Sequence, residues 1–172
     1  VKLGSIVLPE LRELTIITGG LDKKNLAAIC NAKWPKLEKL DLWFGSKSYG
    51  ANTTLKDLKP IFDGKAFPKV KHLGLNNCEF TDEIAQQLPT AKILKQLQVL
   101  DLSDGCMTDA GVKAMADAKD AFQHLARLDL SNNYLSPGER LSSTLNKQTR
   151  SKPQRKPSEY DGVQHRYVSL GE

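Results

Sequence analysis

One short pattern of apolar residues occurs five times along the chain and constrains its fold more than any other feature. The segments 8–16, 34–42, 67–75, 94–102 and 122–130 carry apolar residues at the same four positions. The second apolar position of each segment, which we call the first framework position, is occupied by Leu11, Leu37, Val70, Leu97 and Leu125. Successive members of this set are 26, 33, 27 and 28 residues apart. Recurrence at a period of roughly 20–50 residues indicates a solenoid, in which each unit buries its apolar side chains against its neighbours.

Each repeat is predicted to begin with a β-strand and to continue as a helix. Side chains alternate across a strand, so the fourth and sixth framework positions point into a shared core, and the third and fifth point to the opposite surface. The segments 25–29, 81–88 and 108–116 place apolar residues three or four positions apart, which indicates helices. Because one repeat cannot bury its own leucines, we expect the strands to stack in parallel.

The L-x-x-L-x-L pattern, with T-D-A-G at 108–111 and D-L-S-N-N-Y-L at 129–135, resembles the ribonuclease-inhibitor-like subclass of leucine-rich repeat proteins. The resemblance is to bacterial members of uncharacterised function. It implies an α/β fold, a leucine-rich-repeat solenoid forming a right-handed arc, with parallel β-strands on the concave face and α-helices on the convex face. It also implies that the concave face binds partners. The chain departs from the subclass at the ninth position, where Gly19, Gly45 and Gly105 replace the usual Asn or Cys.

We expect a single domain over residues 1–172, with repeats starting near 8, 34, 67, 94 and 122 and an insertion before its end. Residues 147–166 carry six basic and two acidic side chains, which supply most of the net charge of +5. The segment 146–163 lacks apolar periodicity and is rich in Pro, Ser, Gln and Lys/Arg, so it is predicted to be a flexible insertion. The segment 165–170 (HRYVSL) aligns with the fifth strand and is predicted to be a capping strand, with Val168 and Leu170 pointing inward.

The outward strand positions give the first candidate binding residues. The third positions are Glu13, Lys39, His72, Val99 and Arg127, and the fifth positions are Thr15, Asp41, Gly74, Asp101 and Asp129. We predict that a protein partner contacts the charged members Asp41, His72, Asp101, Arg127 and Asp129. In the alternative interpretation these acidic and basic columns only pair with one another across the strands, where exposed ion pairs contribute little.

Aromatic residues after the second strand give the second candidate. Trp43 and Phe44 follow that strand, and the extra residues of the longest repeat, 46–54, include Tyr49. Trp and Tyr are frequent in interaction hot spots, and insertions in repeat arrays often lie at the binding face. We predict that these three residues anchor a protein partner. In the alternative, Trp43 or Phe44 packs under the loop as local core.

The basic segment gives a second candidate function. Lys147, Arg150, Lys152, Arg155 and Lys156 could contact the phosphates of nucleic acid or another polyanion. The sequence contains no RNA-binding or DNA-reading motif, so a protein partner is the preferred prediction. A further alternative is a targeting module of a larger multidomain enzyme, because the chain begins at Val1 and resembles a piece of a longer protein.

Motifs for catalysis and cofactor binding are absent from the sequence. It contains no G-x-S-x-G, H-E-x-x-H, P-loop or C-x-x-C, and its three histidines are widely spaced. We therefore expect a non-enzymatic monomer without catalytic residues, metal or cofactor. Three cysteines are too few for a disulfide scaffold and favour a reducing, cytoplasmic setting. No apolar run approaches the ~20 residues of a membrane span, so we predict no contact with a membrane.

Overall fold

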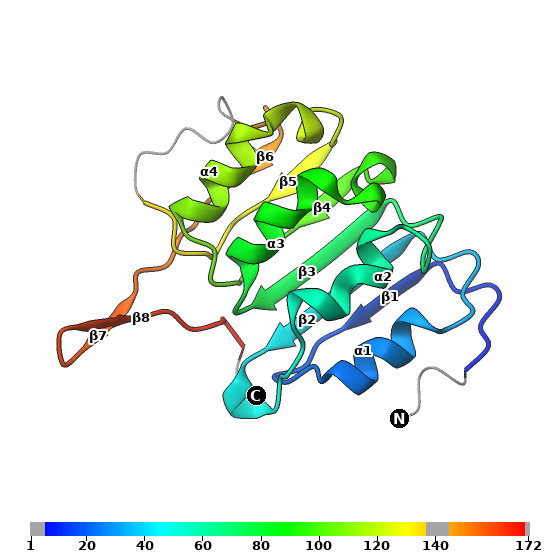
Figure 1. Ribbon diagram of the computed structural model, residues 1–172, viewed down its shortest axis with the longest axis horizontal. Helices are drawn as coiled ribbons and strands as arrows, with labels where there is room; N and C mark the ends of the chain where they lie inside the picture. The colour runs from blue at the N-terminus through cyan, green and yellow to red at the C-terminus, as the bar shows by residue number, and fades with distance from the viewer. Residues whose placement is uncertain (1–5, 137–144, 171–172) are drawn as a thin grey trace.

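A computed structural model describes residues 6–136 and 145–170 of the chain. Six parallel strands form one sheet in chain order, and helices cover one of its two faces (Figure 1). We call the helix-covered face convex and the opposite face concave. The predicted α/β leucine-rich-repeat arc is confirmed. The strands are β1 (Glu13–Ile16), β2 (Lys39–Gly45), β3 (His72–Cys78), β4 (Val99–Asp101), β5 (Arg127–Asp129) and β6 (Thr149–Arg150).

The register of the sheet follows the sequence alignment of the repeats. Glu13 pairs with Lys39, Lys39 with His72, His72 with Val99, and Val99 with Arg127. The column at the fifth position therefore also lies side by side. Its members are Thr15, Asp41, Gly74, Asp101 and Asp129.

The framework leucines form the core between the sheet and the helices. Leu40, Leu73, Leu100 and Leu128 are all fully buried at the fourth position of their strands. Leu14, at the same position of β1, is only half-buried because β1 has a neighbouring strand on one side only. Burial of one repeat thus depends on the repeats at both of its sides.

Helices follow the strands where the apolar spacing predicted them, and polar side chains define their starts. Asp22 accepts a hydrogen bond from the backbone N–H of Asn25 at 2.8 Å, and Thr108 caps its helix in the same way. Asp82, near the start of α3, also accepts from the N–H of Thr108 at 2.8 Å, which joins two repeats. The α-helices are α1 (Lys23–Cys30), α2 (Lys59–Phe62), α3 (Thr81–Gln87) and α4 (Asp109–Asp117); the 3-10 helices are η2 (Lys47–Tyr49), η3 (Leu55–Leu58), η4 (Leu88–Thr90), η5 (Lys92–Gln96) and η6 (Lys119–Phe122).

The segment after residue 145 differs from the prediction of a flexible insertion, 146–163, followed by a capping strand, 165–170. The sixth strand of the sheet comes from inside the basic segment: β6 extends the sheet beside β5. The chain then forms an antiparallel hairpin of β7 (Ser158–Tyr160) and β8 (Val163–His165), which projects from the body (Figure 1). Residues 166–170 form no strand; they cross the turns that follow β5 and β4 and the end of β3.

Polar side chains explain why a segment without apolar periodicity is nevertheless packed. Asn146 is 5% exposed, and its amide donates to the carbonyl oxygens of Phe122 and Leu125 at 2.8 and 3.1 Å. The Gln154 amide group donates to the carbonyl of Leu130 at 2.8 Å and accepts from the N–H of Asn133 at 3.0 Å. These amides satisfy main-chain groups at the last edge of the sheet, so hydrogen bonding does what apolar contacts do elsewhere.

Candidate protein-binding site

A charged group lies on the concave face where β2 meets β3. The Asp41 carboxylate lies 3.2 Å from the Lys39 ammonium and 3.0 Å from Nε2 of His72. Burial raises the pKa of Asp41, but the close polar contacts with His72 and Lys39 outweigh it, so the pKa lies below its usual value. The line between Oδ1 of Asp41 and Nε2 of His72 is poorly directed for a hydrogen bond, which leaves both atoms buried without a well-aligned partner. The group is therefore charged and not fully satisfied.

Gly74 lies at the centre of the concave face and allows the neighbouring side chains to lean over it. A Cβ atom at this position would be 2.3 Å from Oδ1 of Asp41 and 2.4 Å from Oδ1 of Asn76. Either distance is far shorter than a van der Waals contact. The glycine thus provides the space in which these two polar side chains approach each other from adjacent strands.

Two further carboxylates stand on the other side of Gly74. Oδ1 of Asp101 accepts from the Asn76 amide at 2.8 Å and from the N–H of Ser103 at 2.9 Å. Burial raises the pKa of Asp101; the charge of Asp129 on the adjacent strand adds to this increase, and the bonds from Ser103 and Asn76 oppose it. Asp129 is 6% exposed and lies 3.7 Å from the Arg150 guanidinium of β6. The concave face therefore carries two neighbouring carboxylates on β4 and β5, with Arg150 beside Asp129 and Arg127 two residues before it on β5.

The structure separates the three aromatic residues predicted to act together. Trp43 is half-buried on the concave face, two residues after Asp41 on the same strand. Phe44 is 1% exposed and packs edge-on against Phe80, with ring centroids 5.8 Å apart, so its predicted contact with a partner is wrong. β2 stays extended as far as Gly45, whose φ is +76°, and Phe44 therefore faces the core with Leu42. Tyr49 lies in η2 and is 53% exposed.

Arg127 lies on the outward face of β5 as predicted, but it takes no part in the alternative pairing of acidic and basic columns. It is exposed on β5, and within residues 6–136 and 145–170 it has no acidic side chain within ion-pairing distance. Asp129 is instead approached by Arg150, a residue predicted to contact a polyanion. The alternative of columns paired across the strands thus holds for Asp41 and His72; Lys39 pairs with Asp41 within β2, and Arg127 pairs with neither column.

The basic segment is divided between structural and exposed side chains. Arg155, predicted as a phosphate contact, donates from Nε to the carbonyl of Asn132 at 2.7 Å and from Nη2 to the carbonyl of Gly105. Its guanidinium lies 4.6 Å from the centroid of the Tyr134 ring. Arg155 is therefore part of the structure of the last turn. The other four basic side chains predicted to contact a polyanion remain exposed: Lys147, Arg150, Lys152 and Lys156.

The thiol groups are all in environments that disfavour the reactive thiolate. Burial raises the pKa of Cys30 to about 11 and that of Cys106 to about 11. Cys78 is fully buried, and its pKa is also raised by burial. Among the described residues, no group of three or more His, Cys, Asp and Glu side chains is placed to hold a metal ion. In the same ranges, no helix combines the length and the apolar content needed to cross a bilayer.

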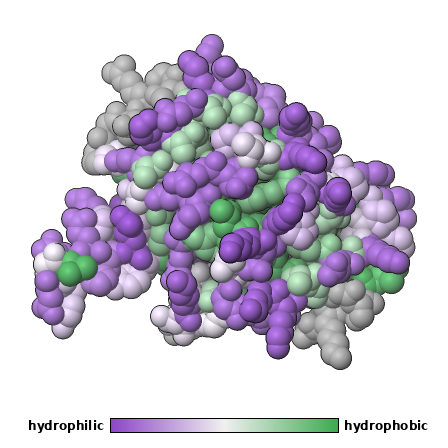
Figure 2. Space-filling model, viewed as in Figure 1, coloured by the Kyte–Doolittle hydropathy of each residue, from purple (hydrophilic) through white to green (hydrophobic). Residues whose placement is uncertain are grey.

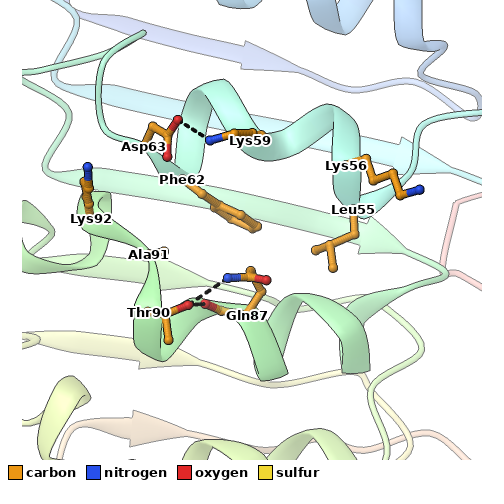
Figure 3. A pocket seen from close by; sticks show the side chains of 9 residues that line it. All are labelled: Leu55, Lys56, Lys59, Phe62, Asp63, Gln87, Thr90, Ala91 and Lys92. Atoms are coloured by element: carbon orange, nitrogen blue, oxygen red, sulfur yellow. Dashed lines mark hydrogen bonds and ion pairs between the residues drawn. The ribbon is translucent and has the colours of Figure 1, made fainter.

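A hollow of about 560 Å³ opens on the convex face between the η3–α2 segment and the α3–η4 segment (Figure 3). Phe62 and Leu55 supply its apolar surface, and the ammonium groups of Lys56, Lys59 and Lys92 lie around it. Lys59 is paired with Asp63 at 2.7 Å. Figure 2 shows this convex face as largely hydrophilic, with apolar surface between the helices. The apolar spacing predicted no helix over residues 55–62, where η3 and α2 lie, so nothing in the sequence pointed to the hollow.

A row of residues at the end of β3 and in the turns after β4 and β5 binds the segment 166–170. Asn77 and Asp104 have φ values of 53° and 64°, a region that Asn and Asp tolerate better than other side chains. The side chains of Asn77, Asp104 and Tyr134 all hydrogen bond to residues 166–170. The repeat pattern places Asn77 and Asp104 at its eighth position, but it gives no indication of Tyr134, because the bound segment is more than 30 residues away in sequence.

Comparison with known proteins supports the repeat assignment and assigns no function. The family described as "Leucine Rich repeat" matches residues 95–116. The chain is similar to a crystal structure of a protein from Bacteroides fragilis, with 29% sequence identity and a TM-score of 0.75. That match covers 93% of this chain and 44% of the other, so the chain spans less than half the length of that protein. No curated protein matches. The chain thus has the fold of a leucine-rich-repeat arc and matches that family over one repeat, and its predicted subclass stays a prediction.

Proposed function

We propose that the chain is a protein-binding module that contacts its partner through the concave face around Trp43, Asp41 and Asp101. Leucine-rich repeat domains are typically protein-interaction modules, because a stack of short strands presents an extended surface of outward side chains. The observation that carries the proposal is the position of Trp43. It is a large aromatic side chain on the solvent-facing side of the sheet, next to a charged group that is incompletely hydrogen-bonded.

The chemistry of this face favours a partner that presents a basic side chain beside an apolar one. Asp101 and Asp129 are neighbours in the sheet, and their mutual repulsion helps to raise the pKa of Asp101. A Lys or Arg of the partner placed between them would relieve this repulsion, which offsets part of the cost of desolvating the cation. Trp43 offers the apolar surface nearby that hot spots require.

The long second-repeat loop takes a smaller part in this proposal than the sequence predicted. Phe44 is core, which leaves Tyr49 as its exposed aromatic residue. We propose Tyr49 as a contact at the rim of the interface, where truncation costs less affinity than at the centre.

Affinity capture with crosslinking from cell extract, followed by titration of the captured protein, tests the proposal. Trp43→Ala is expected to weaken binding at least about tenfold, or about 1.4 kcal/mol. Asp101→Asn is expected to weaken it less and to reduce its dependence on salt. Tyr160→Ala is the matched control, because Tyr160 is 73% exposed on the projecting hairpin and lies outside the concave face.

The fold of each variant is checked by circular dichroism and thermal unfolding before binding is compared. If Trp43→Ala retains the native fold and the affinity of the parent, the concave face is not the interface. If Tyr160→Ala loses as much affinity as Trp43→Ala, the interface lies at the hairpin instead.

A further inference from the structure

The segment 166–170, which we call the tail, is bound to the repeats through its main chain. The hydroxyl of Tyr134 accepts from the N–H of Tyr167 and donates to its carbonyl oxygen, both at 2.8 Å. Nη1 of Arg155 donates to the same carbonyl at 2.7 Å. The N–H of Ser169 donates to the carbonyl of Asp104 at 3.2 Å.

The contact at Asn77 is the most specific of the set. Its amide nitrogen donates to the carbonyl of Leu170, and its amide oxygen accepts from the N–H of Leu170, both at 2.8 Å. One side chain thus satisfies both main-chain groups of one residue, as a neighbouring β-strand would. Recognition of this kind depends on an extended main chain rather than on the side chain that it carries.

The three repeats bind the tail in reverse order. Tyr134 follows β5, Asp104 follows β4 and Asn77 lies at the end of β3, and they contact Tyr167, Ser169 and Leu170 respectively. The tail therefore runs across the ends of the strands, and in Figure 1 it passes from the hairpin toward the arrowhead of β3. Adjacent strands lie about 4.8 Å apart, so an extended chain passes from one repeat to the next every one to two residues.

The side chains of the tail alternate in burial along this path. Tyr167 and Ser169 are exposed, whereas Val168 is 9% exposed and Leu170 is half-buried. This is the alternation of an extended strand with one side against a surface. The two apolar side chains of the tail, Val168 and Leu170, thus face the repeats.

We propose that Asn77, Asp104 and Tyr134 form a binding track for extended peptide, which the tail occupies in cis. Its partner is an extended segment of another protein with apolar residues two positions apart and a small polar residue between them. Such a segment competes with the tail for the same main-chain hydrogen bonds. A tethered segment competes at an effective concentration of about 1 mM, so the track binds a partner weakly until the tail is displaced.

Fluorescence anisotropy with a labelled peptide of the sequence HRYVSLGE, residues 165–172, tests the proposal on the full chain. Val168→Asp places a charge at the buried position of the tail and is expected to release it. The variant should then bind the free peptide at least about tenfold more tightly than the parent chain. Val163→Asp is the matched control, because Val163 is 54% exposed on the hairpin, and it should behave as the parent.

Two further variants locate the binding to the track. Asn77→Gly removes the amide and keeps the positive φ, which glycine adopts freely. Added to Val168→Asp, it should reduce peptide binding about tenfold. Ser169→Pro removes the N–H that donates to Asp104 and releases the tail without adding a charge. A peptide with both apolar residues replaced by Asp should not bind any variant.

Hydrogen exchange on the parent chain provides a readout that needs no substitution. Millimolar peptide should accelerate exchange at the amides of Ser169 and Leu170 and leave the amides of the strands unchanged. Failure of both released variants to bind, with native circular dichroism, would overturn the proposal. If the variants do not fold, unchanged exchange in the parent chain overturns it. Trp43→Ala should alter none of these results, which separates the track from the concave face.

Discussion

The two ends of the solenoid bury their apolar side chains to very different extents. Around β5 the framework leucines Leu128 and Leu130 are fully buried, because β6 and the polar side chains of residues 145–155 cover that edge. Around β1, the equivalent Leu14 and Ile16 are only half-buried, and in residues 6–136 and 145–170 β1 pairs only with β2. The same leucine pattern thus gives a complete core only where a further unit follows it in space.

The largest difference is expected when the same substitution is made at equivalent positions of the two ends. Leu128→Ala removes a fully buried side chain from β5 and should lower the free energy of unfolding by about 3 kcal/mol. Leu14→Ala acts on the half-buried leucine of β1 and should cost about half as much. Urea denaturation measures both values. Equal losses would mean that the difference in burial has no energetic consequence.

A smaller loss is expected at the polar covering of the last edge. Asn146→Ala leaves the carbonyl groups of Phe122 and Leu125 and the N–H of Gln148 without their partner, in a buried setting. We expect a loss of about 2 kcal/mol. Asn52→Ala is the control near the first edge. The Asn52 side chain accepts from the exposed N–H of Lys23, and in the variant water can accept from this N–H instead. This variant should cost well under about 1 kcal/mol, and a comparable loss in both variants would contradict the role given to Asn146.

The sequence predicted the sheet well because that part of the fold is set by a repeated local rule. An alternating apolar pattern fixes which side chains face the core, and its recurrence fixes the register, since any slip by one residue would expose the leucines. The same rule applied to β2 accounts for Phe44: with Leu40 and Leu42 it lies on the inward face, and only the position of the turn decides where that alternation ends. In this repeat the positive φ falls at Gly45, one residue later than at Asn77.

The C-terminal segment could not be predicted in this way because its packing depends on partners remote in sequence. Gln154 and Arg155 have no apolar pattern around them, and they bind the carbonyl groups of Leu130, Asn132 and Asp104, which lie at least 23 residues away. Composition indicated flexibility, and it was misleading because amide and guanidinium groups replaced apolar contacts. The concave candidate residues were predictable in position, whereas their pairing depended on the absence of a side chain at Gly74.

Gly74 lies where the two halves of the concave face meet, and a methyl group there should disturb both. Gly74→Ala places Cβ against Oδ1 of Asp41 and against Oδ1 of Asn76, so one or both side chains must move. We expect a loss of about 1 kcal/mol in the free energy of unfolding, since side chains yield more easily than backbone. Partner affinity measured beside Trp43→Ala should also fall. An unchanged affinity would place the interface away from this junction.

The smallest effects are expected for the carboxylates on either side of Gly74, and their signs should be opposite. The pKa of Asp41 is lowered in the fold, so its charge stabilises the protein above the unfolded value of about 3.8, and this contribution is lost as the pH falls through the lower folded pKa. Asp41→Asn should therefore destabilise the protein at pH 7, by less than about 1 kcal/mol for a partly exposed group.

Asp101 should show the reverse dependence, because burial and the charge of Asp129 raise its pKa. Its ionisation costs stability as the pH rises from 3.8 through the folded pKa, so Asp101→Asn should stabilise the protein at pH 7. The replacement keeps an amide oxygen to accept from Ser103 and places a donor beside Asp129. Urea denaturation at pH 7, 5 and 3 should show the two variants on opposite sides of the parent at pH 7, and the difference should disappear as the carboxylates protonate. Destabilisation by both variants at pH 7 would mean that the charge of Asp101 stabilises the fold, as that of Asp41 does. The carboxylates on β4 and β5 would then not form a site where a cationic partner relieves their repulsion.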